Sequence, residues 1–154
     1  MRTAIISVLM IVSSSTVFCS PSGASQMPED AFCLALNIYH EARSKSLAGQ
    51  VAVANVTLNR VKSEKFPDNI CDVVFQKDQF SWYWDGKSDT PREKDAWETA
   101  KMIAMNMLDP ESTISDNTQG ALFYHADYVK PYWSKIFTRI TKIGPHIFYV
   151  DNES

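Results

Sequence analysis

Residues 35–61, ALNIYHEARSKSLAGQVAVANVTLNRV, decide the fold because they join two helix-forming segments through a short polar linker. The first helix is predicted from about residue 29 to 43, since the preceding MPED segment places acidic side chains at the positive end of the helix dipole. Ser46 can cap a second helix that continues to about residue 61. This second segment is apolar on every side, which predicts a central, buried helix.

The next part of the chain predicts a loop followed by one more helix. Residues 63–89 lack a regular apolar period, so a long irregular segment is expected there. Residues 90–93, TPRE, match a capping box with Pro91 at the first helical position. A helix is therefore expected from there to about residue 108.

The C-terminal part has the pattern of strands. ALFYHA at residues 121–126 and HIFYV at residues 146–150 are rich in aromatic and β-branched side chains, and Gly144-Pro145 forms a turn between HIFYV and the preceding TKI. A chain of 154 residues suits one domain. The predicted fold class is α+β, a compact single domain with helices first and a small antiparallel sheet last.

Residues 1–24 have the pattern of a secretory signal peptide, with Arg2 as the only charge and small residues up to Ala24. Their apolar run is too short to span a bilayer, and no second candidate span follows. Cleavage near Ala24 leaves 14 Lys and Arg against 18 Asp and Glu, a formal charge of −4. This balance argues against nucleic acid as a partner. We expect an exported protein of the periplasm, or an extracellular protein of the cell wall, without an integral membrane segment.

Two cysteines, Cys33 and Cys71, remain after this cleavage. In an oxidising compartment they are expected to form a disulfide, which would stabilise the fold by on the order of 3 to 4 kcal/mol. The alternative is that Cys33 is a thiol nucleophile assisted by His125, as in a cell-wall peptidase.

Glu41 shares one helical stripe with Leu34 and Ile38, on the face predicted to be buried. Burying an ionised carboxylate is costly, so Glu41 should be paired, hydrogen-bonded or protonated through a raised pKa. A protonated carboxyl at the edge of a cleft suits general acid catalysis. The alternative, which helical geometry alone favours, is a solvent-exposed salt bridge from Glu41 to Arg43 or Lys45.

Metal binding is not predicted. A zinc helix of the HExxH type that began at His40 would need a second histidine at position 44, which is Ser44. The three histidines, His40, His125 and His146, are far apart in sequence and have no accompanying ligand cluster. No cofactor is therefore expected.

An aromatic run at residues 78–86, DQFSWYWDG, has two interpretations. Aromatic faces stack on pyranose rings, and Gln79, Ser81 and Asp85 could hydrogen-bond sugar hydroxyls. Equally, a tryptophan-rich loop can cover a small core, and alternate residues would face opposite ways. The aromatic residues concerned are Phe80, Trp82, Tyr83 and Trp84.

Taken together, residues 35–61, FPDNICDVVFQKDQFSW at 66–82, ALFYHA and IGPHIFYV resemble the SleB-type cell wall hydrolases, a family of spore-cortex-lytic enzymes. The resemblance extends from about residue 30 to 150 and includes Glu-Ala-Arg, Gly-Gln, Asn-Arg and Gln-Phe-Ser motifs in order. It implies a lysozyme-like domain that cleaves peptidoglycan between N-acetylmuramic acid and N-acetylglucosamine. Enzymes of this kind are lytic transglycosylases, which leave a 1,6-anhydro-muramic end.

The resemblance implies that Glu41 is the catalytic residue. Glycosidases usually need two carboxyls, but a transglycosylase can use one glutamate first as acid and then as base. The candidates for a second carboxyl are Asp78, Asp85 and Asp89. The expected substrate-binding residues are Gln50, Gln79, Phe80, Ser81, Trp82, Tyr124 and His125.

Three alternatives remain open for the function: a muramidase that hydrolyses the same bond, a Cys33-dependent peptidase or amidase, and a non-catalytic glycan-binding module. Lys45 departs from the family pattern, because many members carry an acidic residue there. We expect Lys45 to change surface charge and little else. A monomer is expected.

Overall fold

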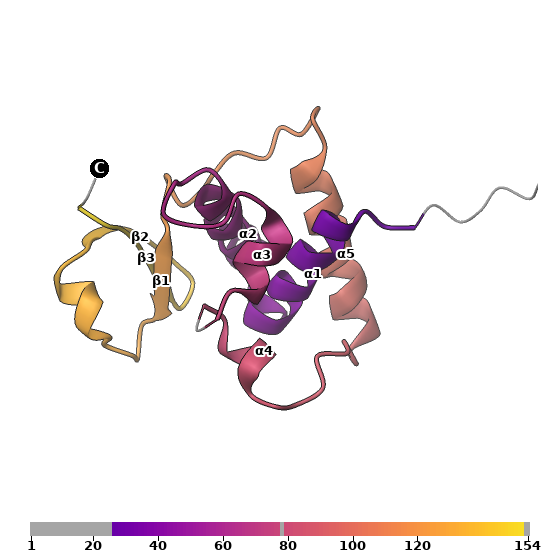
Figure 1. Ribbon diagram of the computed structural model, residues 1–154, viewed down its shortest axis with the longest axis horizontal. Helices are drawn as coiled ribbons and strands as arrows, with labels where there is room; N and C mark the ends of the chain where they lie inside the picture. Colours follow the sequence, from indigo (N-terminus) through magenta and orange to yellow (C-terminus); the bar gives the residue numbers. More distant parts are fainter. Residues whose placement is uncertain (1–25, 78, 153–154) are drawn as a thin grey trace, which may run out of the picture.

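The computed structural model describes residues 26–77 and 79–152. Within these residues five α-helices come first, and a three-stranded sheet forms one end of the molecule (Figure 1). The expected signal peptide, residues 1–24, lies outside the described residues. None of the helices described is both long and apolar enough to cross a membrane.

The first helix, α1 (Glu29–Ala42), confirms the prediction for residues 29–43. Its stripe of Leu34 and Ile38 is fully buried. Glu41 is the next residue on that stripe and lies in the last turn of the helix, so its side chain lies at the edge of the core.

The second helix, α2 (Leu47–Val61), lies across the middle of the core, as its uniformly apolar sequence predicts. Ser46 caps it by accepting a hydrogen bond from the Gly49 amide. A buried hydrogen bond of 3.0 Å from Asn37 Nδ2 to Thr57 Oγ1 fixes α2 against α1.

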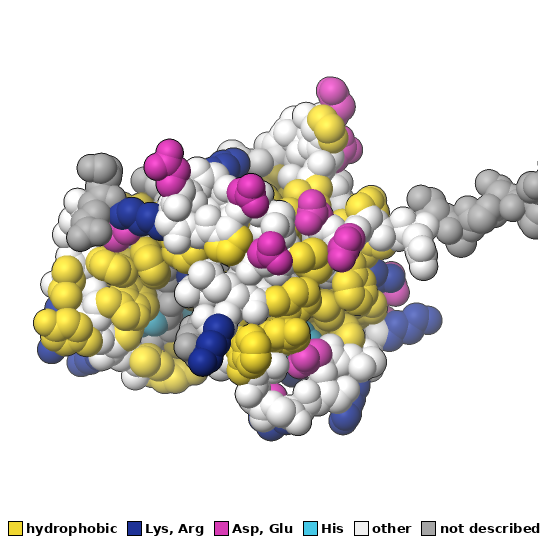
Figure 2. Space-filling model, in the orientation of Figure 1, with side chains coloured by type: hydrophobic (Ala, Val, Ile, Leu, Met, Phe, Trp, Pro, Cys, Tyr) yellow, Lys and Arg dark blue, Asp and Glu magenta, His cyan; other side chains and the backbone are white. Residues whose placement is uncertain are grey.

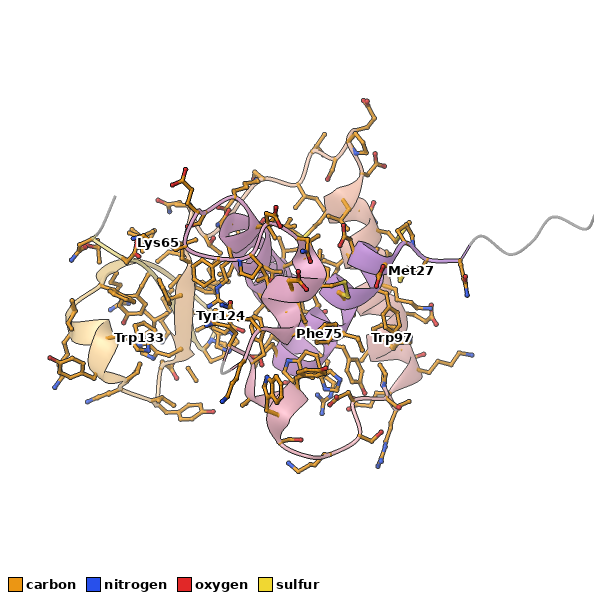
Figure 3. The ribbon with its side chains drawn as sticks, in the orientation of Figure 1. Met27, Lys65, Phe75, Trp97, Tyr124 and Trp133 are labelled. Atoms are coloured by element: carbon orange, nitrogen blue, oxygen red, sulfur yellow. A yellow bond between two sulfur atoms is a disulfide. The ribbon has the colours of Figure 1, made fainter. Side chains whose placement is uncertain are left out.

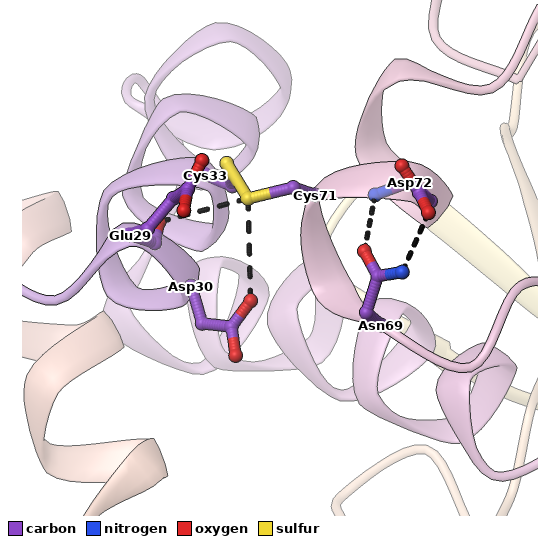
Figure 4. The surroundings of a disulfide bond; sticks show 6 residues. All are labelled: Glu29, Asp30, Cys33, Asn69, Cys71 and Asp72. Carbon is purple, nitrogen blue, oxygen red and sulfur yellow. Dashed lines mark hydrogen bonds between the residues drawn. A yellow bond between two sulfur atoms is a disulfide. The ribbon is translucent and has the colours of Figure 1, made fainter.

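The prediction of an irregular segment at residues 63–89 is wrong in part, since two short helices interrupt it. They are α3 (Ile70–Phe75) and α4 (Ser81–Trp84). Asn69 caps α3 by accepting a hydrogen bond from the Asp72 amide (Figure 4). Helices of six and four residues show no clear period and are unstable alone, so tertiary contacts decide their formation.

The predicted disulfide between Cys33 and Cys71 is confirmed and joins α1 to α3 (Figure 4). Its two cysteines are 38 positions apart in sequence, so closing this loop should stabilise the fold by about 3 to 4 kcal/mol. The bond also leaves Cys33 without a free thiol, which removes the cysteine-nucleophile alternative.

The last helix, α5 (Lys94–Leu108), begins later than predicted, and the capping box at residues 90–93 is wrong. Tyr39 of α1 replaces it: its hydroxyl oxygen accepts hydrogen bonds of 3.0 Å from the amides of Arg92 and Glu93. A partner from another helix therefore satisfies these amides, which a local sequence pattern cannot reveal.

The sheet confirms the predicted antiparallel arrangement, with strand order β1-β3-β2. Its strands are β1 (Phe123–Ala126), β2 (Thr138–Ile143) and β3 (His146–Val150). Between β1 and β2 the chain forms the 3-10 helix η1 (Tyr132–Lys135), and hydrophobic side chains reach the surface at this end of the molecule (Figure 2). The whole is a mixed α+β domain.

A small apolar cluster joins the sheet to α2. Its fully buried members are Ala52 and Val56 of α2, Phe148 of β3, and Ala121 just before β1. Tyr124 of β1 packs against this cluster, which places that strand beside the end of α1 where Glu41 lies.

Candidate active site

Glu41 lies in a cleft of about 510 Å³ between the helices and the sheet. In Figure 3, Tyr124 occupies the same region, between the sheet and the helix that carries Phe75. The cleft brings together residues from α1, α2, α4 and β1, which are distant in sequence. Its lining consists of Glu41, Arg60, Gln79, Phe80, Ser81, Trp84 and Tyr124.

Tyr124 holds the carboxyl group of Glu41. Its hydroxyl donates a hydrogen bond of 2.9 Å to Glu41 Oε2. The ring of Tyr124 packs on His146 and Phe148, with ring centroids 5.1 and 5.6 Å apart, so β3 supports its position. Burial raises the pKa of Tyr124 well above its usual value, and the charge of Glu41 raises it further. The hydroxyl therefore remains a donor across the physiological pH range.

The electrostatic setting of Glu41 favours its protonated form. Burial raises the pKa of Glu41, while the hydrogen bond from Tyr124 and the positive charge of Arg60 offset part of this increase. A carboxyl group that keeps its proton to higher pH can act as a general acid.

Arg60 is the residue of the cleft whose importance the sequence pattern did not reveal, although it belongs to the Asn-Arg motif. It is 5% exposed, and its Nε donates a hydrogen bond of 2.8 Å to the Leu122 carbonyl. Its guanidinium lies 5.0 to 5.9 Å from the ring centroids of Phe66, Phe80 and Phe123. Burial lowers the pKa of Arg60. It supplies a fixed positive charge beside Glu41.

The aromatic run divides between the core and the cleft. Phe80 lines the cleft together with Gln79 and Ser81. Trp82 is instead buried and stacks on His40, with ring centroids 4.4 Å apart. Trp84, 54% exposed, lines the cleft in place of Trp82.

The opposite orientations of Trp82 and Trp84 follow from the helical turn of α4. In a helical turn, residues two apart project about 200° apart, so Trp82 and Trp84 face opposite ways. The sequence pattern did predict that alternate residues would face opposite ways. It did not predict which tryptophan would face the cleft.

Two other expected substrate-binding residues lie outside the cleft lining. Gln50 is buried, and its side-chain amide donates a hydrogen bond of 3.2 Å to the Lys45 carbonyl. His125 projects from β1 on the side opposite Tyr124, with Nδ1 2.8 Å from the Ala126 carbonyl and Nε2 3.0 Å from the Tyr149 hydroxyl. Gln50 thus ties the linker between α1 and α2, and His125 supports the sheet.

The salt bridge considered for Glu41 does not form with Arg43. Arg43 Nε instead lies 2.7 Å from Glu93 Oε1. Lys45 is half-buried, and its ammonium charge contributes to lowering the pKa of His146, after the larger effect of burial. The charge of Lys45 therefore acts on His146, whose ring packs on Tyr124.

Of the acidic residues considered as a second catalytic carboxyl, Asp85 and Asp89 line a neighbouring pocket of about 380 Å³, not the cleft of Glu41. Asp85 also pairs with Lys87, 3.0 Å away. Asp78 lies outside the described residues. Across residues 26–77 and 79–152, no three His, Cys, Asp or Glu side chains gather closely enough to hold a metal ion.

Comparisons with known proteins point in one direction. A family model described as Cell Wall Hydrolase matches residues 44–149, a match that begins just after Glu41. The spore cortex-lytic enzyme of Bacillus cereus is 38% identical over 130 residues, and that of Halalkalibacterium halodurans is 36% identical over 130 residues. Each match covers 83% of this chain, but 46% and 36% of the respective relatives. The chain thus spans less than half the length of these relatives.

Solved structures give closer agreement in length. The catalytic domain of the germination-specific lytic transglycosylase SleB from Bacillus anthracis superposes with a TM-score of 0.62 at 37% identity, covering 85% of this chain and 100% of that one. The catalytic domain of the Bacillus cereus SleB protein superposes with a TM-score of 0.64 at 33% identity, covering 82% and 94%. The similarity therefore includes nearly all of a catalytic domain.

Proposed function

Because the chain belongs to the cell wall hydrolase family, we propose that it cleaves the glycan strand of peptidoglycan between N-acetylmuramic acid and N-acetylglucosamine, with Glu41 as its catalytic acid. One observation carries this proposal: Glu41 lies in a cleft between helices and sheet, held by Tyr124, with its pKa raised by burial. Those are the requirements for donating a proton to a glycosidic oxygen.

The reaction is a lytic transglycosylation in two proton transfers. Glu41 first donates its proton to the bridging oxygen, and the bond from that oxygen to the anomeric carbon of N-acetylmuramic acid breaks. The C6 hydroxyl of the same sugar then bonds to the anomeric carbon and gives its proton to the Glu41 carboxylate. Glu41 is thereby regenerated, and one glutamate serves as acid and base.

Tyr124 and Arg60 stabilise the carboxylate that exists between the two transfers. The Tyr124 hydroxyl donates to Glu41 throughout, and Arg60 provides a nearby positive charge. Both interactions grow stronger as negative charge develops on Glu41. They therefore stabilise the transition state of proton transfer more than they stabilise the resting enzyme.

The helical side of the cleft binds the sugars. Trp84 offers an exposed ring for stacking on a pyranose, and the buried ring of Phe80 adds an apolar part to the lining. Gln79 and Ser81 line the same wall and can hydrogen-bond hydroxyl or acetamido groups. All lining residues come from one chain, so a monomer suffices. Export through residues 1–24 would bring the domain to the cell wall.

Digestion of purified peptidoglycan with the protein, followed by mass spectrometry of the soluble products, tests the proposal. We expect muropeptides with 1,6-anhydro-muramic ends. Products with a reducing end and one added water would identify a muramidase that hydrolyses the same bond. Released peptides with intact glycan, or binding without cleavage, would refute glycan cleavage.

A further inference from the structure

We propose that Asp116, outside the cleft, is a positioning residue that holds Tyr124 against Glu41. The inference rests on the proposed function of Glu41. Asp116 lies in the segment that leads from α5 into β1, ahead of Tyr124 in sequence.

Both carboxylate oxygens of Asp116 are fully used as acceptors. Oδ1 accepts hydrogen bonds from the Thr118 amide (2.7 Å) and the Thr118 hydroxyl (2.6 Å). Oδ2 accepts from the Gly120 amide (2.7 Å) and from Asn59 Nδ2 (2.9 Å). Although burial acts to raise it, these hydrogen bonds hold the pKa of Asp116 below its usual value. The ionised carboxylate of Asp116 therefore fixes the conformation of residues 116–120.

Helix α2 holds the folded segment through Asn55, whose Nδ2 donates a hydrogen bond of 3.2 Å to Asn117 Oδ1, and through the consecutive side chains of Asn59 and Arg60. Asn59 Nδ2, besides meeting Asp116, lies 3.2 Å from the Ala121 carbonyl. Arg60 Nε donates to the Leu122 carbonyl at 2.8 Å. The chain is thus fixed to α2 up to the residue before β1, and Tyr124 is the second residue of that strand.

These contacts close a ring through the molecule. Glu41 belongs to α1, which is joined to α2 by the hydrogen bond between Asn37 and Thr57. Helix α2 is joined through Asn59 to Asp116, whose segment leads into β1, and Tyr124 of β1 returns to Glu41. These links together set the separation between the Tyr124 hydroxyl and the Glu41 carboxylate.

The polar links matter because the apolar contact between α2 and the sheet is small. Its fully buried side chains are two alanines, one valine and one phenylalanine. Such a surface favours contact but tolerates sliding, whereas hydrogen bonds with fixed donors and acceptors specify one register. A displacement of about 1 Å at a catalytic group can cost on the order of a hundredfold in rate.

The test is a double-mutant cycle with Asp116→Asn and Tyr124→Phe, measured as kcat on purified peptidoglycan. Asparagine keeps the shape of the side chain but replaces one acceptor oxygen by an NH2 group. That group must face N–H donors from Thr118, Gly120 or Asn59, so hydrogen bonds are lost. We expect Asp116→Asn to lower kcat about tenfold or more in the wild-type background. In the Tyr124→Phe background the same change should cost less than about twofold, because coupled residues are not additive.

The matched control is Asp109→Asn, an exposed aspartate whose Oδ1 accepts a hydrogen bond of 2.9 Å from the Glu111 amide in a similar turn. It should leave kcat unchanged in both backgrounds. Asp116→Asn should also move the alkaline limb of the pH–rate profile in the same direction as Tyr124→Phe, which a change in overall stability would not do. If Asp116→Asn does not fold, Asn59→Ala replaces it in the cycle.

Additive effects in the cycle, or full activity of Tyr124→Phe, would overturn the role of Asp116. Either result would leave the proposed function intact as long as the wild-type protein releases glycan fragments. A wild-type protein without glycan cleavage would refute the proposed function itself, and with it this inference.

Discussion

The hydroxyl of Tyr124 and the carboxylate of Glu41 meet at 2.9 Å although 83 residues separate them in sequence. The contact joins the strand that begins the sheet to the last turn of α1. Through this hydrogen bond, the helices and the sheet each contribute one side chain to the same candidate site.

Replacing Glu41 by Gln should nearly abolish glycan cleavage, because a carboxamide is far too weak an acid to protonate the glycosidic oxygen. Loss of a general acid typically costs 10² to 10⁴-fold, so release of soluble fragments should fall by about a thousandfold. Turbidity of a peptidoglycan suspension measures it. Glu93→Gln is the control, since Glu93 is exposed and pairs with Arg43. Substantial activity in Glu41→Gln would remove Glu41 from the mechanism.

The same substitution should change how stability depends on pH. Since the pKa of Glu41 is raised in the folded state, the folded protein binds this proton more tightly than the unfolded chain does. The contribution of Glu41 to folding therefore becomes less favourable as pH rises from 4.5, the usual pKa of a glutamate, through the raised pKa of the folded state. Above that window Glu41→Gln should have a higher Tm than wild type, and the difference should vanish at lower pH. An equal Tm at all pH values would contradict a raised pKa.

Tyr124→Phe should move the pH–rate profile as well as slow the reaction. The hydrogen bond from Tyr124 lowers the pKa of Glu41, so its loss raises that pKa further. Activity requires protonated Glu41 and is lost as pH rises through its pKa, so the alkaline limb should shift to higher pH. A drop in kcat of about tenfold is expected, because a hydrogen bond to a charged group contributes roughly 1.5 kcal/mol or more. A shift to lower pH would mean that Tyr124 does not bond to Glu41 in the active enzyme.

Trp84→Ala should weaken substrate binding because it removes the exposed ring from the cleft wall. We expect KM for soluble glycan fragments to rise about tenfold with a smaller effect on kcat, which is at the upper end of the about 0.5 to 1.5 kcal/mol of an aromatic stacking contact. Tyr83→Ala is the comparison, since Tyr83 is partly exposed on the same short helix but does not line the cleft. Equal effects of the two changes would indicate a general role of α4.

Replacing both Cys33 and Cys71 by Ser should lower the free energy of unfolding by about 3 kcal/mol while the folded protein keeps its activity. Chemical denaturation with and without reductant measures the difference. Loss of activity in a variant that is still folded would return Cys33 to the list of catalytic candidates.

The sequence predicts the helix pair well because both of its signals are local. Ser46 provides the cap of α2, and the Leu34 and Ile38 stripe marks the buried face of α1. The same stripe shows that Glu41 is unusually placed. It cannot show its partner, because Tyr124 comes from a strand at the other end of the chain.

What sequence reasoning missed depends on tertiary contacts. The start of α5 is set by the Tyr39 hydroxyl and not by residues 90–93. The choice between Trp82 and Trp84 depends on His40, which offers a ring for Trp82 to stack on. Gln50 has the polarity of a ligand-binding residue, but its partner is the Lys45 carbonyl.

The anchoring of α1 determines which wall of the cleft can move. This helix is held near its start by the disulfide to α3 and near its end by the Tyr39 hydroxyl bonded to two amides before α5. Glu41 is therefore mounted on an element with little freedom, whereas the sheet is attached through a small apolar surface and a few hydrogen bonds. We expect any opening that admits a long glycan strand to occur on the sheet side of the cleft and to require temporary loss of the hydrogen bonds from Asn59 and Arg60, while Glu41 stays in place.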